Sequence, residues 1–264
     1  MLCMPDELAV ALRAAGAAGA VAMRAFGRKV RVERKADDTP VTVFDRAAEE
    51  AARRVIARAF PSDGVLGEEH GATRTGADAR WLIDPIDGTK SFIRGLPYWG
   101  TLVAREVRGR LTAGVIALPA MGRTIWAARG RGAFLNGRRV RVSRQGALRG
   151  ACVLHADLDT FVRYRALGVF DGIARRGAII KAIGDCPAYV WLGSGCVEAM
   201  IEPEVDPWDI AAPRIIIEEA GGRVTDWKGR NSGGIRNVLA TNGRIHAALL
   251  KILRAHRVRA SRSN

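Results

Sequence analysis

The sequence has little that would support a disulfide framework or a structural zinc site. Four cysteines occur in 264 residues, and no two of them form a C-x-x-C pair; they are Cys3, Cys152, Cys186 and Cys196. There are also only four histidines, and zinc-finger and zincin patterns are absent. Scattered cysteines in a chain of this length are typical of a reducing compartment, so we expect a cytoplasmic protein.

Long hydrophobic runs are lacking as well. No stretch approaches the roughly 18 uncharged apolar residues of a membrane span. The first seven residues lack the basic region of a signal peptide, and the Ala-rich stretch 8–26 is interrupted by Arg13 and Arg24. Because hydrophobic residues still make up 48% of the chain, we expect a globular protein with no membrane partner, built as one large domain or two closely joined lobes.

Negative charge is scarce relative to positive charge, and the formal net charge is +15. Such a balance can indicate a nucleic-acid partner. The basic residues are spread along the chain, however, with local density at 28–35, 129–144 and 251–262, and no aromatic residues lie among them for base stacking. We therefore favour arginine as the general surface cation and leave RNA binding open, since a positive field also favours a phosphorylated substrate.

The hydrophobic pattern indicates a mixed α/β chain. Helices are predicted over residues 6–26, 44–60, 158–168, 186–195, 210–220 and 243–254. Strands are predicted near residues 30–32, 65–66, 81–83, 101–107, 111–118, 124–128, 140–142, 152–154, 178–183, 199–201 and 238–240. Loops are expected at 35–40 and 70–80, and the basic tail 254–264 is expected to fray.

The middle of the chain reads as a meander of antiparallel strands, with a hairpin signal at Asn136-Gly137. The later strands alternate with helices. We therefore predict a seam near residues 145–150, with an antiparallel-sheet lobe over about 1–147 that carries a metal site, and a mixed α/β lobe over about 148–264.

The main chemical signal is the segment 84–89, which reads DPIDGT. Asp84 and Asp87 follow a short buried strand, and Pro85 and Gly88 supply turn chemistry that can bring the two carboxylates together. Magnesium in proteins is held by one or two carboxylates together with waters and substrate phosphate, and amides at Gly88 and Thr89 could bind phosphate if they open a helix. An Asp-rich capping turn is the alternative.

Two further acidic positions lie near ends of predicted elements. Glu68 and Glu69 follow a strand, and Asp209 lies near the start of a helix, because Pro213 is expected within the first turn. For Asp209 alone, a plain helix cap is the better interpretation.

Several segments together resemble the inositol monophosphatase family, in the same order and spacing over residues 5–250. They are residues 67–69 (GEE), 81–89 (WLIDPIDGT), 136–137 (NG), 140–143 (VRVS), 207–212 (PWDIAA) and 218–222 (EEAGG). The resemblance implies a layered α/β/α/β/α sandwich of the inositol monophosphatase and fructose-1,6-bisphosphatase type, and commonly a homodimer.

The resemblance also implies roles for individual residues. It implies that the metal ligands are Glu68, Asp84, Asp87 and Asp209, with the backbone carbonyl of Ile86. It further implies that Thr89, Asp45 and Glu68 are catalytic, where Thr89 orients the attacking water and Asp45 is its acidic partner.

The chemistry is consistent with that assignment. Five acidic groups around a phosphate would repel it, so cations must be present, and we expect two or three Mg²⁺ per site. Phosphoryl transfer needs an in-line nucleophile and neutralised oxygens, which such ions help to provide.

The expected substrate is a small phosphorylated metabolite. Residues 90–97 (KSFIRGLP), Gly184-Asp185 and Glu202-Pro203 are most similar to the histidinol-phosphate phosphatase branch of the family. This similarity implies histidinol phosphate, with substrate contacts from Asp185, Glu202 and Arg94. Asp185 could meet a substrate ammonium or could only cap a helix that begins at Cys186, and the sequence favours neither.

Other functions stay open at this point. They are an inositol-1-phosphate phosphatase, a phosphatase of bisphosphorylated or sulfated nucleotides, and a regulator that binds RNA or RNA polymerase on the same scaffold. A haloacid-dehalogenase-type phosphatase is less consistent with the sequence, since it needs a second Asp two residues after the first, where this chain has Ile86.

Overall fold

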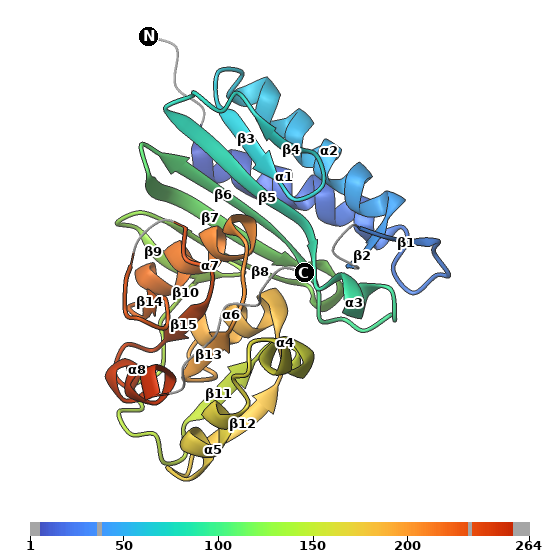
Figure 1. Cartoon of the computed structure of the whole chain (residues 1–264). Coiled ribbons are helices and arrows are strands. Elements are labelled where there is room, and N and C mark those ends of the chain that lie inside the picture. Colours follow the sequence, from blue (N-terminus) through green and yellow to red (C-terminus); the bar gives the residue numbers. More distant parts are fainter. Residues whose placement is uncertain (1–5, 36–38, 232–233, 256–264) are drawn as a thin grey trace.

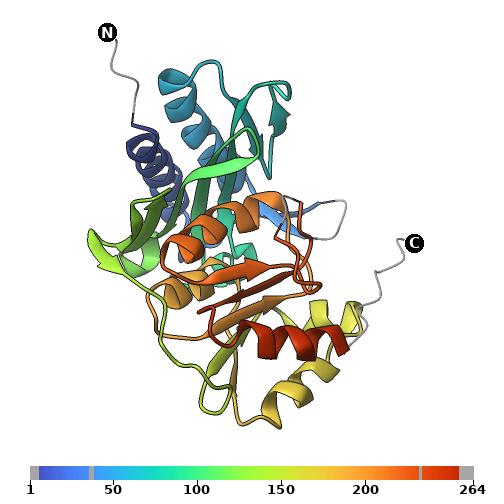
Figure 2. The ribbon, with the colours of Figure 1, turned by 90° about the vertical axis from the view of Figure 1, so that its left-hand side faces the viewer.

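The computed structural model describes residues 6–35, 39–231 and 234–255. Two sheets alternate with three layers of helices, which confirms the expected α/β/α/β/α sandwich (Figures 1 and 2). Cys3, part of the predicted loop 35–40 and nearly all of the predicted tail 254–264 lie outside the described residues.

The larger sheet has eight strands in the order β10-β9-β8-β7-β6-β5-β3-β4. Their bounds are β3 Gly64–Gly67, β4 Gly71–Thr73, β5 Ala79–Asp87, β6 Gly100–Val107, β7 Arg110–Leu118, β8 Arg123–Ala128, β9 Gly132–Leu135 and β10 Arg138–Val140. From β5 to β10 each strand pairs antiparallel with the next one in the chain, so the predicted meander is confirmed. The β9–β10 hairpin turns at Asn136-Gly137, where both residues have positive φ, as that dipeptide favours.

The smaller sheet has five strands in the order β12-β11-β13-β15-β14. They are β11 Cys152–His155, β12 Ile179–Ala182, β13 Ala199–Glu202, β14 Arg223–Thr225 and β15 Val238–Thr241. Strand β11 is parallel to both of its neighbours, while β13, β15 and β14 pair antiparallel. A short ribbon, β1 Val32–Arg34 with β2 Pro40–Thr42, stands apart from both sheets.

Helices α1 (Glu7–Met23) and α2 (Val43–Ala59) cover the outer face of the larger sheet. Asp6 is the N-cap of α1, and its carboxylate accepts a hydrogen bond from the amide of Leu8 at 3.1 Å. Its buried stripe is mostly alanine, and these small side chains allow close packing against α2.

Helices α6 (Asp185–Gly193) and α7 (Pro207–Glu219) fill the space between the sheets, and α4 (Leu158–Arg163), α5 (Gly168–Ala174) and α8 (His246–Ala255) cover the far side. The middle layer is tightly packed. A Cβ on Gly114 of β7 would lie 2.5 Å from a methyl carbon of Ile215 on α7, so only glycine lets the helix approach the sheet this closely. The continuous core joins the two predicted lobes, and their boundary near residue 147 stays a prediction.

Some predicted elements were wrong. The helix predicted over 158–168 ends at Arg163, and a second helix, which was not predicted, begins at Gly168 and runs to Ala174. The predicted loop 70–80 contains β4 and the first residues of β5, while β9 and β14 were missed because each is only three or four residues long.

Helix α7 also begins earlier than expected. It starts at Pro207, which occupies the first turn, and Pro213 lies inside the helix rather than in its first turn. The rule that places proline at a helix start therefore applies to Pro207. At Pro213 the backbone donor to the carbonyl of Asp209 is missing, and packing against the sheet stabilises the helix in spite of this. In the described part of the chain, no helix is both long and apolar enough to cross a bilayer.

One buried histidine makes stability depend on pH. His246 is 1% exposed and lies between the hydroxyls of Thr225 and Thr241, at 3.0 and 2.9 Å from its two ring nitrogens. Burial, together with the charge of Arg223, lowers the pKa of His246 to about 4. In the unfolded chain the pKa of His246 is about 6.5. As pH falls below about 6.5, the unfolded state therefore binds a proton on this imidazole, whereas the native state stays unprotonated down to about pH 4.

We therefore expect the free energy of unfolding to fall between pH 7.5 and pH 5, with His246 contributing about 2 kcal/mol of that loss. Urea unfolding of the wild type and of His246→Gln at both pH values measures this contribution, because Gln can keep hydrogen bonds to the threonines but does not titrate. His70→Gln, at an exposed position, is the control. An equal pH dependence in wild type and His246→Gln would contradict the prediction.

Candidate active site

A bulge in β5 brings Asp84 and Asp87 to the same site. In the β5–β6 ladder Asp84 pairs with Leu102 and Asp87 pairs with Gly100, so three steps on β5 oppose two steps on β6. Side chains three residues apart on a regular strand would point to opposite faces, and the extra residue of the bulge corrects this. The carboxylate of Asp84 accepts a hydrogen bond from the amide of Ile86 at 3.0 Å, across Pro85, which fixes the turn.

Gly88 follows the bulge with φ of +87° and is the N-cap of the short helix α3, Thr89–Phe92. A Cβ at this position would lie 2.6 Å from the carbonyl oxygen of Tyr98. Both the left-handed backbone and the close approach therefore require glycine here. The predicted phosphate contacts Gly88 and Thr89 both line the pocket described below.

Asp209 reaches the same place from the first turn of α7. Its carboxylate accepts a hydrogen bond from the amide of Asp206 at 2.7 Å. Asp209 therefore does act as a helix-capping residue, which was the preferred interpretation of this residue taken alone. Yet Asp84, Asp87 and Asp209 each place a carboxylate oxygen within 4.8 Å of the others. Asp209, although distant in the sequence from Asp84 and Asp87, is therefore both a helix-capping residue and a member of the carboxylate cluster.

Burial and mutual repulsion make it unfavourable for all three carboxylates of the cluster to be ionised. Burial raises the pKa of Asp84 well above its usual range, and repulsion from Glu68, Asp87 and Asp209 raises it further. Burial and the charge of Asp87 likewise raise the pKa of Asp209 well above normal. Three carboxylates this close need a compensating cation if they are all to be ionised.

A hard divalent cation fits this donor set. Mg²⁺ prefers oxygen ligands, and three converging carboxylates offer both the oxygens and the charge. Asp87 is further fixed because it accepts a short hydrogen bond from the amide of Cys186 at the start of α6. The acidic cluster can thus hold a metal ion.

Thr89 links Asp45 to the backbone of Ile86, the residue just before Asp87. The Thr89 hydroxyl donates to the carbonyl of Ile86 at 3.0 Å and lies 3.5 Å from a carboxylate oxygen of Asp45. Asp45 is 2% exposed and accepts hydrogen bonds from the amide and hydroxyl of Thr42 at 2.8 and 2.6 Å. Burial raises the pKa of Asp45 despite these two hydrogen bonds.

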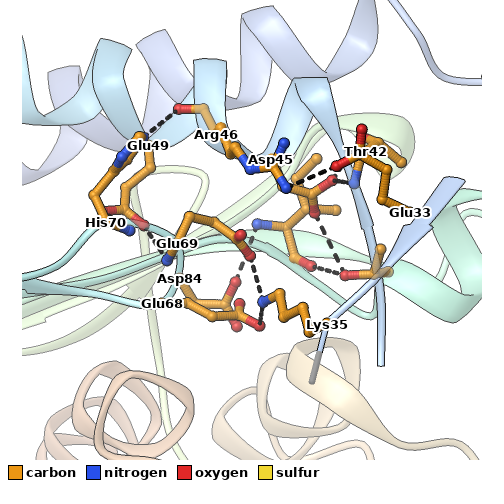
Figure 3. A network of polar contacts seen from close by, with 12 residues as sticks. Glu33, Lys35, Thr42, Asp45, Arg46, Glu49, Glu68, Glu69, His70 and Asp84 are labelled. Atoms are coloured by element: carbon orange, nitrogen blue, oxygen red, sulfur yellow. Dashed lines mark hydrogen bonds and ion pairs between the residues drawn. The ribbon is translucent and has the colours of Figure 1, made fainter. Parts of the chain in front are cut away.

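Glu68 lies beside Asp84 but outside the three-carboxylate cluster (Figure 3). The ammonium of Lys35 lies 2.7 Å from a carboxylate oxygen of Glu68 and 2.6 Å from one of Glu69. Although burial lowers it, attraction to these two carboxylates raises the pKa of Lys35 above its ordinary value. Lys35 was not predicted from the sequence, because its contacts join the loop after β1 to a strand end more than thirty residues away.

Glu49 on α2 fixes the turn that carries Glu68, and it was also missed. Its carboxylate is fully buried and accepts a hydrogen bond from the amide of Glu69 at 2.6 Å (Figure 3). It also pairs with Arg53 at 2.6 Å. A Cβ on Gly67 would lie 2.1 Å from that carboxylate. The glycine of the GEE motif is therefore required by the approach of a helix, which sequence patterns do not reveal.

The acidic cluster forms one wall of a pocket of about 840 Å³ between the larger sheet, α6 and α7. The three predicted substrate contacts, Asp185, Glu202 and Arg94, all line it. Arg94 is exposed and donates to the carbonyl of Lys90 at 2.7 Å.

Asp185 is the first residue of α6 and has φ of +56°, an uncommon conformation for a residue with a side chain. The N-cap is Gly184, and no side-chain capping bond occurs at this end of the described helix. The alternative that Asp185 caps a helix beginning at Cys186 is therefore wrong. Burial, with repulsion from Asp157, raises the pKa of Asp185 to about 7.

Glu202, at the end of β13, is 7% exposed and accepts a short hydrogen bond from the hydroxyl of Tyr189. Burial raises the pKa of Glu202 to about 8, although the Tyr189 hydrogen bond acts in the opposite direction. Tyr189 was not anticipated from the sequence; its place on α6, facing Glu202, depends on tertiary packing.

Comparisons with known proteins find relatives over nearly the whole chain. The model of the inositol monophosphatase family matches residues 4–263. A histidinol-phosphatase of Mycobacterium tuberculosis is 39% identical over 260 residues, which is 95% of this chain and 98% of the relative. The Nus factor SuhB of Pseudomonas aeruginosa is 36% identical over 270 residues and covers 96% and 97% of the two chains.

Among solved structures, an inositol monophosphatase of Thermotoga maritima superposes with a TM-score of 0.88 at 32% identity, over 95% of this chain and 97% of the other. Family model, relatives and fold thus agree over nearly the full length. This chain belongs to the inositol monophosphatase family and is a phosphoric monoester hydrolase.

Proposed function

We propose that this protein is a Mg²⁺-dependent phosphomonoesterase whose substrate carries a cationic group beside its phosphate ester, and that this substrate is histidinol phosphate. The relative from Mycobacterium tuberculosis bears the name histidinol-phosphatase, but names alone do not separate this substrate from inositol phosphates. The observation that carries the proposal is the pair of carboxylates Asp185, which is half-buried, and Glu202, which is buried.

Most other charges of the pocket are already paired. Lys90 lies 2.7 Å from a carboxylate oxygen of Asp157 and 3.6 Å from one of Asp159, and Arg163 pairs with Glu204 at 3.1 Å. No ion pair joins Asp185 or Glu202 to a cation within the described ranges.

A carboxylate that is wholly or partly withdrawn from water is costly to ionise unless a partner compensates its charge. The raised pKa values of Asp185 and Glu202, about 7 and 8, express that cost. An ammonium or imidazolium of the substrate would restore both carboxylates to the ionised form. The neutral ring of an inositol phosphate would supply no such charge, which favours an amine-bearing substrate.

For catalysis we assign Asp84, Asp87, Asp209, Glu68 and the carbonyl of Ile86 to holding two or three Mg²⁺. Bound divalent cations would offset the charge of the phosphate and make a water more acidic. Lys35 now neutralises Glu68, so it would have to release that carboxylate for Glu68 to act as a ligand.

Thr89 and Asp45 position the attacking water. The Thr89 hydroxyl donates to the Ile86 carbonyl or to Asp45, and its oxygen lone pair is then free to accept a hydrogen bond from water. Asp45 is held by Thr42 and can take up a proton through Thr89. Gly88 and Thr89 would contact the phosphate, and Arg94, which lines the pocket, would contact the substrate.

We further propose a cytoplasmic homodimer that acts on a small metabolite rather than on nucleic acid.

A phosphate-release panel with Mg²⁺ tests the substrate. We expect kcat/KM for histidinol phosphate to exceed that for inositol-1-phosphate, adenosine 3′,5′-bisphosphate and fructose-1,6-bisphosphate by about 10- to 100-fold, since one charge-assisted contact contributes about 1.5–3 kcal/mol. A preference for inositol-1-phosphate would contradict the substrate assignment. No release from any ester, with tight RNA binding that falls steeply with salt, would contradict the enzymatic role.

A further inference from the structure

A second groove lies against helix α7, separate from the acidic pocket, and its walls are rich in arginine. It has a volume of about 370 Å³ and contains five arginine side chains from five different elements or loops: Arg80, Arg110, Arg129, Arg214 and Arg223. They come from β5, β7, the loop after β8, α7 and β14. We propose that this groove is a binding site for a small phosphate-bearing anion, distinct from the phosphatase site.

The charges in the groove do not balance. Its only acidic lining residues in the described part of the chain are Glu106 and Glu218. Arg80 pairs with Glu106 at 2.7 Å, and Arg214 pairs with Glu218 at 3.2 Å. Each carboxylate therefore compensates one guanidinium, and three positive charges are left without a compensating carboxylate.

Those three guanidinium groups belong to Arg110, Arg129 and Arg223. The guanidinium of Arg129 donates a hydrogen bond to the carbonyl of Leu111 at 2.6 Å. This bond orients the side chain, but a carbonyl carries no net charge, so the positive charge of Arg129 is not compensated. For Arg110 and Arg223 no side-chain hydrogen bond or ion pair to another described residue occurs, and both side chains are exposed. Three like charges converging on one groove repel one another, and a bound anion would relieve that repulsion.

The shape and chemistry favour phosphate over a simple halide. Arginine presents a planar fork of donors that matches phosphate oxygens two at a time. A volume of about 370 Å³ falls in the range of small-molecule sites. Leu82, Ile210 and Val224 form an apolar part of the lining, so the groove can also hold the carbon skeleton of a phosphorylated metabolite.

The site is next to the catalytic cluster without being part of it. Arg80, Leu82 and Asp84 follow one another on the same face of β5, and the first two line the arginine groove while Asp84 lines the acidic pocket. On α7, Asp209 lines the acidic pocket, and Arg214 lines the groove. The packed residues Leu82 and Ile210 lie between the two.

Calorimetric titration of the full-length protein with inorganic pyrophosphate, in the presence of EDTA, tests the proposal. Chelation keeps the acidic cluster free of metal, so that cluster repels the anion and the groove is the competing site. We expect one pyrophosphate per chain for the wild type. For Arg110→Ala/Arg223→Ala we expect binding at least about tenfold weaker, since loss of two charge-assisted contacts costs more than 1.4 kcal/mol.

The matched control is Arg13→Ala/Arg58→Ala, which removes two exposed arginines of α1 and α2 and the same total charge; it should bind as the wild type does. Equal weakening in both double variants would show that net charge alone attracts the anion and would overturn the proposal. Absence of pyrophosphate binding, or binding of single-stranded RNA alone, would overturn it as well. Phosphatase activity of Arg110→Ala/Arg223→Ala at saturating Mg²⁺ should stay at the wild-type level, which separates this site from the catalytic one.

Discussion

Replacing Asp84 by Asn is expected to lower kcat/KM by about 1,000-fold. Asp84 is the most buried member of the carboxylate cluster, at 2% exposed. If it is a metal ligand, as we propose, its loss removes several kcal/mol of charge stabilisation in the transition state. Removing the metal from the wild type with EDTA should have an effect at least as large, and added Mg²⁺ should restore activity. Asp171→Asn is the control, since Asp171 pairs with Arg175 on the surface.

Asp84→Asn should be more stable than the wild type in the absence of metal, although it is expected to be less active. Without metal, Asp84→Asn removes one of three carboxylates that repel each other within 4.8 Å, so its melting temperature in EDTA should exceed that of the wild type. Mg²⁺ should then raise the melting temperature of the wild type more than that of the variant. Wild-type activity in Asp84→Asn, or an unchanged response to Mg²⁺, would contradict the role of Asp84 as a ligand.

Replacing Asp185 by Asn is expected to lower kcat/KM for histidinol phosphate by about 10- to 100-fold, and to change kcat/KM for inositol-1-phosphate by less than about threefold. The reason is that one charge-assisted hydrogen bond to a substrate cation contributes about 1.5–3 kcal/mol, whereas a neutral partner contributes less. Asparagine tolerates positive φ, so the backbone at φ of +56° should be kept. Steady-state kinetics with both esters measure the difference.

Glu204→Gln is the matched control, because Glu204 lines the same pocket but is already paired with Arg163 and Tyr164. It should affect both substrates alike. A parallel loss for both esters in Asp185→Asn would indicate a structural role for Asp185 and would remove the main support for an amine-bearing substrate. The metal site would remain unaffected by that result, since it depends on Asp84, Asp87 and Asp209.

The long, periodic elements could be predicted from the sequence, and the short ones could not. Helices α1 and α2 and the strands β6 and β7 present clear apolar patterns. Strands such as β9 and β14 have too few residues to show a period, and they exist because neighbouring strands supply their hydrogen bonds. Pro213 misled in another way, because proline normally breaks a helix. It is tolerated inside α7 because this helix is packed between the two sheets.

The sequence by itself determined which chemistry this protein carries. The order GEE, DPIDGT and PWDIAA places carboxylates at ends of elements, and hard cations require oxygen ligands such as these. Only the tertiary structure decided how these residues meet. The bulge turns Asp84 and Asp87 to one side, α7 brings Asp209 to them across more than a hundred residues, and Lys35 lies against Glu68. The paired and unpaired charges that distinguish Asp185, Glu202 and the arginine groove also depend on packing, because compensation of a charge is a property of its neighbours in space.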